Sequence, residues 1–232
     1  MVDPHQVLDN AVWWSLTSHH RRHGEVRGRA ARYRPDASPF AAMESFGEEP
    51  WRDLADLVGP ESTCVLFCAD LPTVLPAGWK VVERGEGRQM IIDPDQLVAV
   101  KPVTSRLLAA ADVPQMLELV EVTRPGPFRA ATVELGRYYG HFEDARLVAM
   151  AGERLQLDGF TEVSAVCTHP DVRGQGLASG LSHHVASGIL QEGRRPFLHV
   201  AATNDRARRV YEALGFRQRR LVDFALVRSP PR

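Results

Sequence analysis

Apolar residues recur at helical spacing in one long stretch near the end of the chain. Within residues 176–193, apolar side chains follow one another every four positions, at Leu177, Leu181, Val185 and Ile189. Such a repeat places them on one face of a helix. Four shorter segments have compositions and ends that are also typical of helices. The helices predicted in this way span residues 13–23, 50–60, 111–123, 176–193 and 204–215.

Short apolar runs between turn residues predict a set of β-strands. They lie at residues 62–70, 132–142, 145–157, 160–170, 196–203, 216–220 and 222–228. Residues 32–43, RYRPDASPFAAM, are interpreted as a loop. Strands outnumber helices, and the first strands after residue 130 follow one another directly. The predicted fold class is therefore α/β of the mixed α+β kind, with one mixed sheet and a few covering helices.

The pattern changes near the middle of the chain, where DPDQLVAVKPVTS places two prolines between apolar runs over residues 93–105. Proline interrupts regular elements, so we predict a domain boundary here. Residues 1–98 then form an N-terminal domain of unknown role. Residues 99–232 form a second domain with the clearer pattern of strands and helices.

Composition narrows the function classes. The chain has 232 residues, of which 44% are hydrophobic and 25% are charged, as in ordinary globular proteins. Its formal net charge of -1 gives no general attraction to nucleic acid or to an anionic membrane, so neither is expected as a partner. A small-molecule or peptide partner is expected instead.

Cysteine and histidine content argues against a disulfide framework and against a metal site. Cys64, Cys68 and Cys167 are odd in number and lack a paired metal spacing. The stretch SHHRRH, residues 18–23, has no ordered ligand set with matching acids or cysteines. We expect no metal and a reducing, cytoplasmic environment. The N-terminal residues have no apolar core of signal-peptide length, and no window has the length of a membrane span.

The stretch VRGQGLAS, residues 172–179, places two glycines and an arginine directly before the long predicted helix. Glycines at such a junction let backbone N–H groups approach an anion, because the first turn of a helix leaves its donors unpaired and partly positive. The expected ligand carries a phosphate or pyrophosphate. Two cofactor classes fit, the dinucleotides and coenzyme A.

The dinucleotide interpretation requires Gly-x-Gly-x-x-Gly directly after a strand and an acid about 20 residues further on. Here the third glycine position is Ser179, and the spacer HPDVR separates the strand from the loop. No acid stands at the tip of the next strand before Asp205. These mismatches disfavour a dinucleotide-dependent oxidoreductase, which stays the weaker alternative.

The loop and its surroundings resemble a known family. Arg173 to Ala178 match the Arg/Gln-x-x-Gly-x-Gly/Ala signature of the GNAT superfamily of acyl-CoA-dependent N-acyltransferases. VSAVCTHPDVRGQGLA and PFLHVAATNDRARRVYEALGF are similar to the two core segments of that family, in the same order. The resemblance covers about residues 100 to 230 and looks closest to the branch that includes glycine N-acyltransferase-like proteins.

This resemblance implies a mostly antiparallel, twisted sheet flanked by helices for residues 99–232. Residues 1–98 are then an additional N-terminal α/β domain, and a degenerate half of the same fold is one hypothesis for it. The implied cosubstrate is acetyl-CoA or a related acyl-CoA, without a metal. The residues implied to bind it are Val166, Cys167, Thr168, Arg173, Gly174, Gln175, Gly176, Leu177, Ala178, Ser179 and Asn204.

Acyl transfer to an amine needs a neutral amine, and at pH 7 only about one lysine-like amine in 2,500 is neutral. Glu162 is the candidate general base, since many family members place a glutamate there. Strand alternation puts it on one face with Ser164, Val166 and Thr168. A solvated strand-edge carboxylate is the alternative role, and Glu134 and Glu153 are rival carboxylates on neighbouring strands.

Tyr211 is the candidate acid that protonates the departing thiolate. It follows Asn204 by seven residues, two helical turns, so both side chains lie on nearly one helix face. A tyrosine packed in the core is the alternative, and Asn204 could serve only as a helix cap. An acyl-cysteine intermediate on Cys167 is disfavoured, because small buried cysteines are common in strands.

The acceptor amine is expected at the loop TRPGPF, residues 123–128. Its prolines stiffen the turn, and the candidate contacts are Pro125, Gly126, Phe128 and Tyr138. A rigid connector without binding function is the alternative for this loop.

The predicted function is N-acyltransfer, in particular N-acetyltransfer, from acetyl-CoA or a related acyl-CoA to a small-molecule or peptide amine by direct attack. A catalytically idle acyl-CoA-binding or sensor module is the main alternative. The acceptor and the acyl length are not fixed by the sequence, and neither is the oligomeric state, for which a homodimer stays open.

Overall fold

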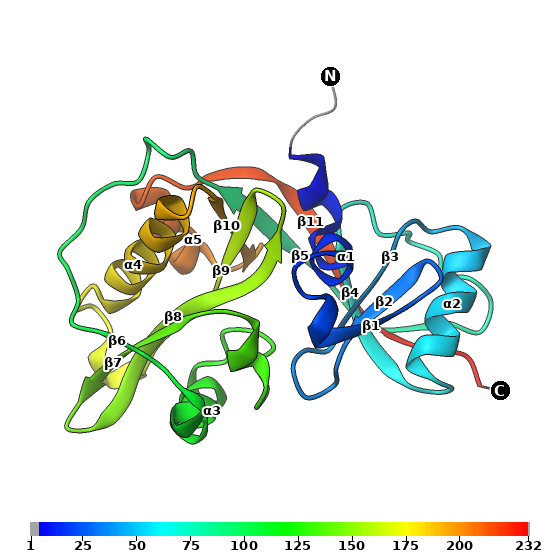
Figure 1. Cartoon of the computed structure of the whole chain (residues 1–232), viewed down its shortest axis with the longest axis horizontal. Helices are drawn as coiled ribbons and strands as arrows, with labels where there is room; N and C mark the ends of the chain where they lie inside the picture. The colour runs from blue at the N-terminus through cyan, green and yellow to red at the C-terminus, as the bar shows by residue number, and fades with distance from the viewer. Residues whose placement is uncertain (1–4, 232) are drawn as a thin grey trace.

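One mixed sheet runs through the whole molecule (Figure 1). The computed structural model describes residues 5–231. Residues 1–4 and 232 lie outside it, and with them the start of the N-terminal segment considered above as a signal peptide. Within residues 5–231 the sheet has eleven strands: β1 (Gly24–Arg27), β2 (Ala30–Tyr33), β3 (Phe40–Met43), β4 (Thr63–Cys68), β5 (Lys80–Ile91), β6 (Arg106–Leu107), β7 (Tyr138–Glu143), β8 (Arg146–Leu157), β9 (Phe160–Thr168), β10 (Arg195–Ala201) and β11 (Arg217–Arg228).

The strands follow the order β1-β2-β3-β4-β11-β5-β10-β9-β8-β7-β6 across the sheet. Only β3–β4 and β9–β10 pair in parallel, and every other neighbouring pair within residues 5–231 is antiparallel. The α-helices of these residues are α1 (Ala11–Thr17), α2 (Glu48–Val58), α3 (Val113–Thr123), α4 (Leu177–Gln191) and α5 (Asp205–Ala213). The mixed, mostly antiparallel α+β fold predicted from the sequence is confirmed.

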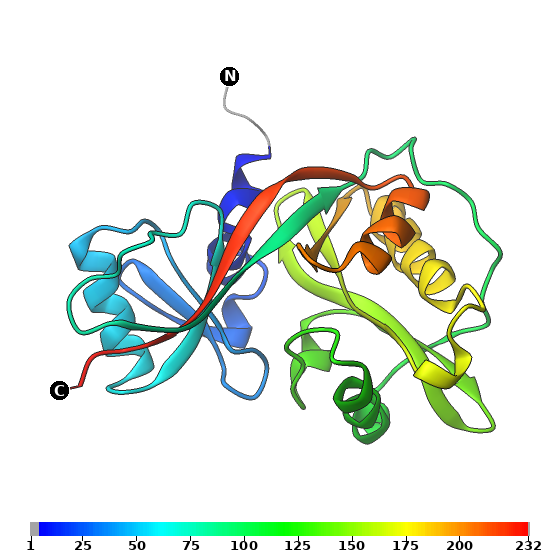
Figure 2. The same cartoon turned by 180° about the vertical axis from the view of Figure 1, so that it is seen from behind.

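The two longest neighbouring strands join the N-terminal and C-terminal parts of the chain. β5 comes from the first part but lies between β10 and β11, and β11, the last strand, reaches past β5 to pair with β4. Figures 1 and 2 show the pair crossing from one side of the molecule to the other. Strands of residues 1–98 and 99–232 therefore interleave in one sheet, and the division into two domains stays a prediction.

Helix α4 covers one face of β8, β9 and β10. Its four periodic apolar residues are all buried, as the sequence predicts: Leu177, Leu181, Val185 and Ile189. Full burial of such a side chain stabilises the fold by about 1.5–3 kcal/mol. Helix α3 packs on the opposite face of β8 and β9, in a cluster with Met150 and Cys167. The start of α4 is thereby held at the ends of β9 and β10.

Several boundaries differ from the sequence-based prediction. Residues 32–43, expected as a loop, contain the end of β2 and all of β3. The first predicted helix ends at Thr17, and the predicted strand over 132–142 begins with a short 3-10 helix, Thr132–Leu135. The two predicted closing strands are one strand, β11, with a bulge between Gln218 and Arg220.

Strand β5 was missed altogether. Its sequence, KVVERGEGRQMI, has charged residues and glycines in place of an apolar run. Its buried part is confined to the last residues, while the rest is exposed or half-buried. An apolar-run criterion finds strands that are buried in a core, and most of β5 faces solvent or a cavity instead.

The histidine-rich stretch is partly inside the protein. His20 and His23 are buried, their rings pack edge to face, and His20 Nδ1 lies 2.9 Å from the Tyr33 hydroxyl. Burial and the nearby His23 lower the pKa of His20 to about 3. Among residues 5–231 no group of three or more His, Cys, Asp or Glu side chains is arranged to hold a metal ion.

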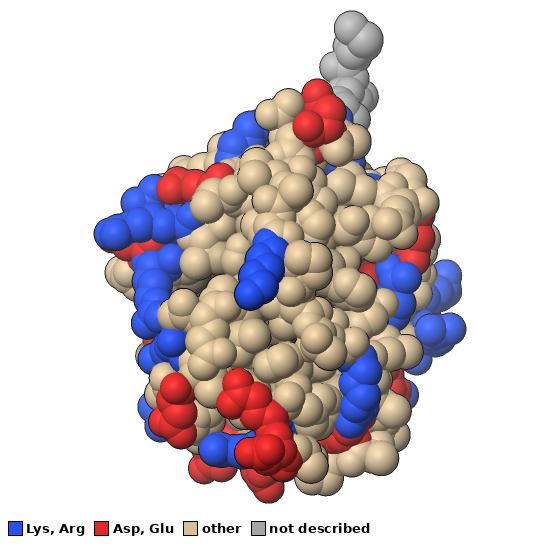
Figure 3. All heavy atoms as spheres, turned by 90° about the vertical axis from the view of Figure 1, so that its left-hand side faces the viewer, with Lys and Arg blue, Asp and Glu red and all other residues tan. Residues whose placement is uncertain are grey.

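The connection from Ile92 to Ser105 has no helix or strand and runs along the outside of α4 (Figures 1 and 2). Leu97, Val100 and Val103 pack from it onto the cluster beneath α4. Figure 3 shows the side of the molecule that carries this connection, on which charged side chains gather toward the rim and the middle is mostly uncharged. No helix within residues 5–231 is long and apolar enough to cross a membrane.

Gly215, just after α5, provides a test of how tightly this connection is fixed. Its φ is +99°, and a Cβ there would lie 2.0 Å from the backbone oxygen of Gln96. We expect Gly215→Ala to lower the free energy of unfolding by more than about 1 kcal/mol, because strain and the backbone clash add. Urea unfolding measures it.

Gly188 is the matched control. It lies inside α4, and a Cβ there would meet no atom within 4 Å. We expect Gly188→Ala to raise the free energy of unfolding by about 0.5–1 kcal/mol, the usual gain from alanine in a helix. Equal effects of the two variants would contradict the prediction.

Candidate active site

A cavity of about 840 Å³ opens where β9 and β10 separate. Phe160–Val163 of β9 pair in parallel with Arg195–Leu198 of β10, and the pairing ends there. Beyond Val163 the edge of β9 has no neighbouring strand on that side, so its backbone groups face the cavity. An unpaired strand edge is a ready site for an extended ligand.

A bulge in β9 sets the direction of its side chains. The register with β8 shifts between Met150 and Gly152, and Ala165 has a φ of +51°. Val163 and Val166, three residues apart, therefore both pack on the α4 side. The prediction that Glu162 and Ser164 share a face with Val166 and Thr168 is wrong, because the extra residue reverses the alternation.

The glycine loop forms one end of the cavity. Gly174 and Gly176 have φ values of +87° and +81°, which favour glycine, and a Cβ on either would meet no protein atom within 4 Å. Gly176 is the N-cap of α4, whose 15 residues direct their unpaired first N–H groups and partial positive charge to this end. The backbone therefore leaves open space in front of a helix N-terminus.

The predicted loop residues line this end of the cavity, with one exception. Gln175 is not among the lining residues. Arg173 donates from Nε to the Thr168 backbone oxygen at 3.3 Å, which ties the loop to the end of β9. The predicted residues that do line the cavity are Val166, Cys167, Thr168, Arg173, Gly174, Gly176, Leu177, Ala178, Ser179 and Asn204.

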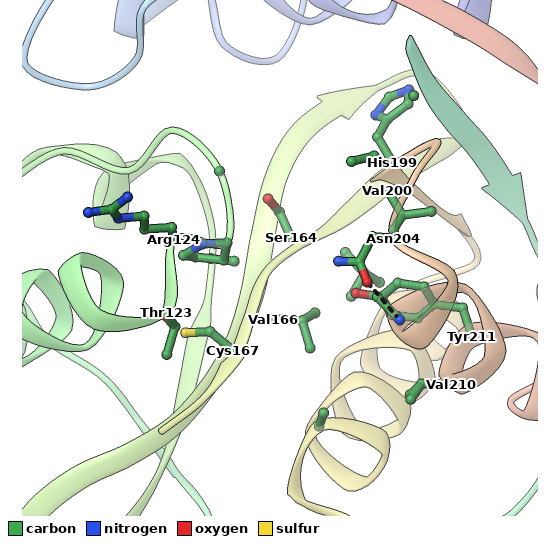
Figure 4. A pocket seen from close by; sticks show the side chains of 18 of the residues that line it. Thr123, Arg124, Ser164, Val166, Cys167, His199, Val200, Asn204, Val210 and Tyr211 are labelled. Carbon is green, nitrogen blue, oxygen red and sulfur yellow. Dashed lines mark hydrogen bonds between the residues drawn. The ribbon is translucent and has the colours of Figure 1, made fainter. Parts of the chain in front are cut away.

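Tyr211 and Asn204 approach the cavity from α5 (Figure 4). The Tyr211 side chain is buried, with its ring edge to face with Phe216, and burial raises the pKa of its hydroxyl. Among residues 5–231 no hydrogen-bond partner of that hydroxyl is found. Asn204 caps α5 by accepting from the Ala207 backbone N–H at 3.0 Å. The tyrosine thus stays protonated beside the cavity.

Glu162 lies at the point where the strands separate, in a buried cluster with Arg154 and His199. Arg154 donates to both carboxylate oxygens at 2.8 and 2.7 Å, and His199 Nδ1 lies 2.8 Å from Oε1. Burial by itself raises the pKa of Glu162, but the Arg154 charge and these hydrogen bonds outweigh it and lower the pKa to about 2. The carboxylate is therefore ionised, and both of its oxygens already have hydrogen-bond partners.

His199 and Arg154 line the cavity, whereas Glu162 does not. The other ring nitrogen of His199, Nε2, lies 3.0 Å from the Gln89 side-chain nitrogen. A neutral imidazole that donates to Glu162 and accepts from Gln89 satisfies all of these partners. Burial lowers the pKa of His199, and the nearby Glu162 carboxylate partly offsets this lowering. Glu162 is predicted from the sequence as the general base, but in the structure its carboxylate lies behind Arg154 and His199 and does not line the cavity.

Comparison with solved structures identifies the family. A GNAT-family protein from Novosphingobium aromaticivorans is 36% identical over 96% of this chain and 98% of its own, with a TM-score of 0.84. The chain belongs to the GNAT family of acetyltransferases. The sequence model of FR47-like proteins matches residues 138–224. No functionally curated protein matches the sequence.

More distant GNAT structures share the fold over nearly the whole chain. A GCN5-related N-acetyltransferase from Kribbella flavida is 18% identical over 97% of this chain and 96% of its own, with a TM-score of 0.65. A GNAT-family acetyltransferase from Colwellia psychrerythraea is 11% identical over 94% and 96%, with a TM-score of 0.52. These matches do not place this GNAT chain in the branch with glycine N-acyltransferase-like proteins.

The rival acids of this GNAT chain do not reach the cavity. Glu134 pairs with Arg34 at 2.8 Å on the surface, and Glu153 is buried against Arg137, whose Nε lies 3.0 Å from its carboxylate. Neither residue lines the cavity. The acidic residues that do are on β5, at positions that sequence reasoning did not consider.

Cys167 is a buried, neutral thiol in this GNAT site. Burial raises its pKa to about 12, and a hydrogen bond with Thr123 only partly opposes this. Figure 4 shows its sulfur directed toward Thr123. A thiol with such a pKa is a poor nucleophile at neutral pH, because the thiolate is the reactive form. The geometry therefore disfavours an acyl-cysteine.

The expected acceptor residues are only partly at the cavity. Pro125 and Gly126 line it, together with Arg124 and Pro127 of the same loop. Phe128 and Tyr138 do not; they pack edge to face, with ring centroids 5.6 Å apart, in the cluster under α3. Tyr138 is only 1% exposed, so the prediction that it forms a wall of the site is corrected.

Most of the cavity wall opposite the glycine loop is not predicted from the sequence. That wall belongs to β3, β4, β5 and β11 and carries Phe40, Val65, Phe67, Glu83, Glu86, Gly87, Phe224 and Leu226. In β4, Val65 and Phe67 alternate with buried Cys64, Leu66 and Cys68, which identifies a second face of that strand. A charged Arg154 inside an apolar strand was a further signal of the site.

The Glu162 cluster predicts a pH dependence of stability. The folded pKa of Glu162, about 2, lies below its ordinary value of 4.5. The contribution of the ionised Glu162 to the free energy of unfolding is therefore complete above about pH 4.5 and is lost as the pH falls toward 2. We expect Glu162→Gln to lower the free energy of unfolding at pH 7 by about 3–5 kcal/mol, since it leaves a buried charge unpaired.

Urea unfolding at several pH values between 7 and 3 checks this expectation. Stability should fall less steeply with acid in Glu162→Gln than in the wild type. Glu118→Gln is the control, because Glu118 is exposed on α3, and it should keep the wild-type slope. Equal slopes for Glu162→Gln and wild type would contradict the assignment.

Proposed function

We propose that this GNAT protein is an N-acetyltransferase that transfers the acetyl group of acetyl-CoA to a primary amine by direct attack. One observation supports it most: a single cavity connects the glycine loop at the start of α4 with the unpaired edge of β9 and with the protonated Tyr211. Along this path the start of α4 suits a polyanionic group, the β9 edge suits an extended arm, and Tyr211 suits a leaving group that needs a proton.

The residues present fit coenzyme A. The open space before Gly174 and Gly176 admits a pyrophosphate, which the first N–H groups of α4 and the Arg173 guanidinium would bind. The free edge of Val166, Cys167 and Thr168 would pair with the amide-bearing arm, and the Asn204 side chain lies beside it. Bound acetyl-CoA supplies a thioester carbonyl as the electrophile.

Tyr211 is suited to donate a proton to the departing sulfur. Its hydroxyl stays protonated because burial raises its pKa, and no hydrogen bond from residues 5–231 holds it elsewhere. Such proton transfer is typically worth about 100- to 10,000-fold in rate. Glu162 has a different role in this proposal: it positions Arg154 and His199 in the cavity wall. The neutral amine attacks the thioester carbon, the C–S bond breaks, and Tyr211 protonates the sulfur. The proton that the nitrogen loses passes to solvent, from which Tyr211 regains its own.

Binding of acyl-CoA is the first expectation to measure. A thermal-shift titration with acetyl-CoA, free CoA and NADH should show a raised midpoint with the CoA species only. At 100 times its dissociation constant a ligand adds about 2.7 kcal/mol of stability. Gly176→Glu should abolish the shift, because a carboxylate would stand in the anion site. A shift with NADH alone would contradict the proposal.

Turnover with Tyr211→Phe tests the proton donor. We expect kcat to fall by about 100-fold or more while the acetyl-CoA midpoint shift stays, because the ring keeps its packing and only the hydroxyl is lost. Release of the CoA thiol, followed with a chromogenic disulfide, measures the rate. Unchanged turnover would remove Tyr211 from the mechanism, and CoA binding without transfer to any amine would favour the idle binding module.

A further inference from the structure

We infer that the acceptor in the proposed transfer is an arylalkyl primary amine without a carboxylate, seated on a wall formed by β3, β4, β5 and the last strand, β11. The inference rests on the proposed function and adds a substrate class to it. The wall is the part of the cavity opposite the glycine loop, on β3, β4, β11 and β5.

The register of these strands places the wall residues on one face. Phe40 lies opposite Val65, Val65 opposite Leu226, and Leu226 opposite Glu83. In the next row Phe67 lies opposite Phe224. Residues directly opposite one another on neighbouring strands point to the same side of a sheet. All six of these residues line the cavity, so the wall is apolar and ends at one carboxylate.

Aromatic rings form the centre of this wall. Phe40 and Phe67 stack with centroids 5.7 Å apart and an interplanar angle of 18°. The His199 ring meets Phe67 edge to face at 4.4 Å. Because His199 is fixed by Glu162 and Gln89, the edge of the aromatic surface next to β10 is rigid. Flat apolar groups pack well against such faces.

Glycine on β5 keeps the space over this wall open. A Cβ at Gly85 would lie 2.4 Å from the Phe224 ring, so any other residue there would displace that ring. Gly87, the next residue of β5 on that face, lines the cavity itself. The wall therefore combines large side chains on β4 and β11 with none on the adjoining part of β5, which leaves a slot beside the rings.

The charge at this end of the cavity is negative. Glu83 lines it, and among residues 5–231 its side chain has no hydrogen bond or ion pair. Glu86 also lines the cavity, but it alternates with Gly85 and Gly87 and pairs with Asp223, so its side chain lies on the opposite face of the sheet.

Arg154 also lines the wall, but Glu162 neutralises it and its guanidinium lies over the Phe40 ring at 4.9 Å. Arg124 also lines the cavity, and Figure 4 shows its side chain directed away from Ser164.

This charge pattern separates two classes of acceptor. An arylalkyl amine brings an apolar body to the rings and, while protonated, a cation to the Glu83 carboxylate. An amino acid brings an additional carboxylate, which Glu83 repels and which no lining cation on β3, β4, β5 or β11 offsets, among residues 5–231. The lining arginines Arg124, Arg173 and Arg206 belong to the loop after α3, the glycine loop and α5. Electrostatic complementarity of this kind decides which of two similar ligands is accepted.

The test compares three acceptors that share one ring, with the wild-type protein and acetyl-CoA at a fixed, saturating concentration. They are 2-phenylethylamine, phenylalanine amide and phenylalanine, and the last two differ in the carboxylate charge. Methylamine is the acceptor without a ring. We expect kcat/KM for each of the first two to exceed that for phenylalanine by about 10-fold or more.

Variants locate the discrimination. Glu83→Gln should narrow the gap between phenylalanine amide and phenylalanine by about 3-fold or more, while Glu118→Gln on the surface of α3 leaves it unchanged. Phe67→Ala should lower kcat/KM for 2-phenylethylamine by about 10-fold with little effect on methylamine. Phe67→Leu retains bulk and serves if the alanine variant does not fold, which the acetyl-CoA midpoint shift reports.

Calorimetric titration of 2-phenylethylamine into the CoA-bound protein separates this inference from the proposed activity. Binding that Phe67→Ala weakens, without any transfer, would support the acceptor site and refute the activity. Transfer to phenylalanine or to methylamine at least as fast as to 2-phenylethylamine would overturn the inference and leave the activity standing. Neither binding nor transfer of the arylalkyl amine would overturn the inference as well.

Discussion

The buried ion pair at the separation of β9 and β10 is the constraint on which the rest of the site depends. A carboxylate without solvent must be compensated, and Glu162 is compensated by one side chain from each neighbouring strand, Arg154 on β8 and His199 on β10. The cluster therefore joins three strands at the level where the pairing of two of them ends. Beyond it the strands diverge, and the cavity lies in the space between them.

Both ends of the cavity follow from this divergence. On one side, β9 continues into the glycine loop and presents the start of α4, which supplies positive potential. On the other side, β10 is followed by β5, β11 and β4, whose register assembles an apolar face with Glu83 at its end. The same opening thus has an electropositive end at the start of α4 and a carboxylate at the opposite end. The internally neutralised cluster of Glu162, Arg154 and His199 lies between them.

Sequence patterns predicted the parts that local physics specifies. The period of α4, the glycines before it and the spacing of Asn204 and Tyr211 are local features, and each is where the pattern placed it. The face on which Glu162 lies relative to Val166 could not be predicted. The bulge at Ala165 reverses the alternation of side chains along β9, and nothing in the sequence marks that bulge. The wall opposite the glycine loop could not be predicted, because it depends on the pairing of β4 with β11 and of β11 with β5, which are remote in sequence.

The interleaving of β5 and β11 has a consequence for how the protein acquires its shape during translation. While the ribosome is still adding β11, β4 and β5 each have an edge that β11 covers in the finished sheet, and the wall opposite the glycine loop lacks Phe224 and Leu226. Uncovered edges are sites of mispairing between nascent chains. The glycine loop and α4 emerge earlier, and the elements on which α4 packs, β7, β8, β9, β10 and α5, all precede β11. The glycine-loop end of the cavity can thus form before the wall opposite it.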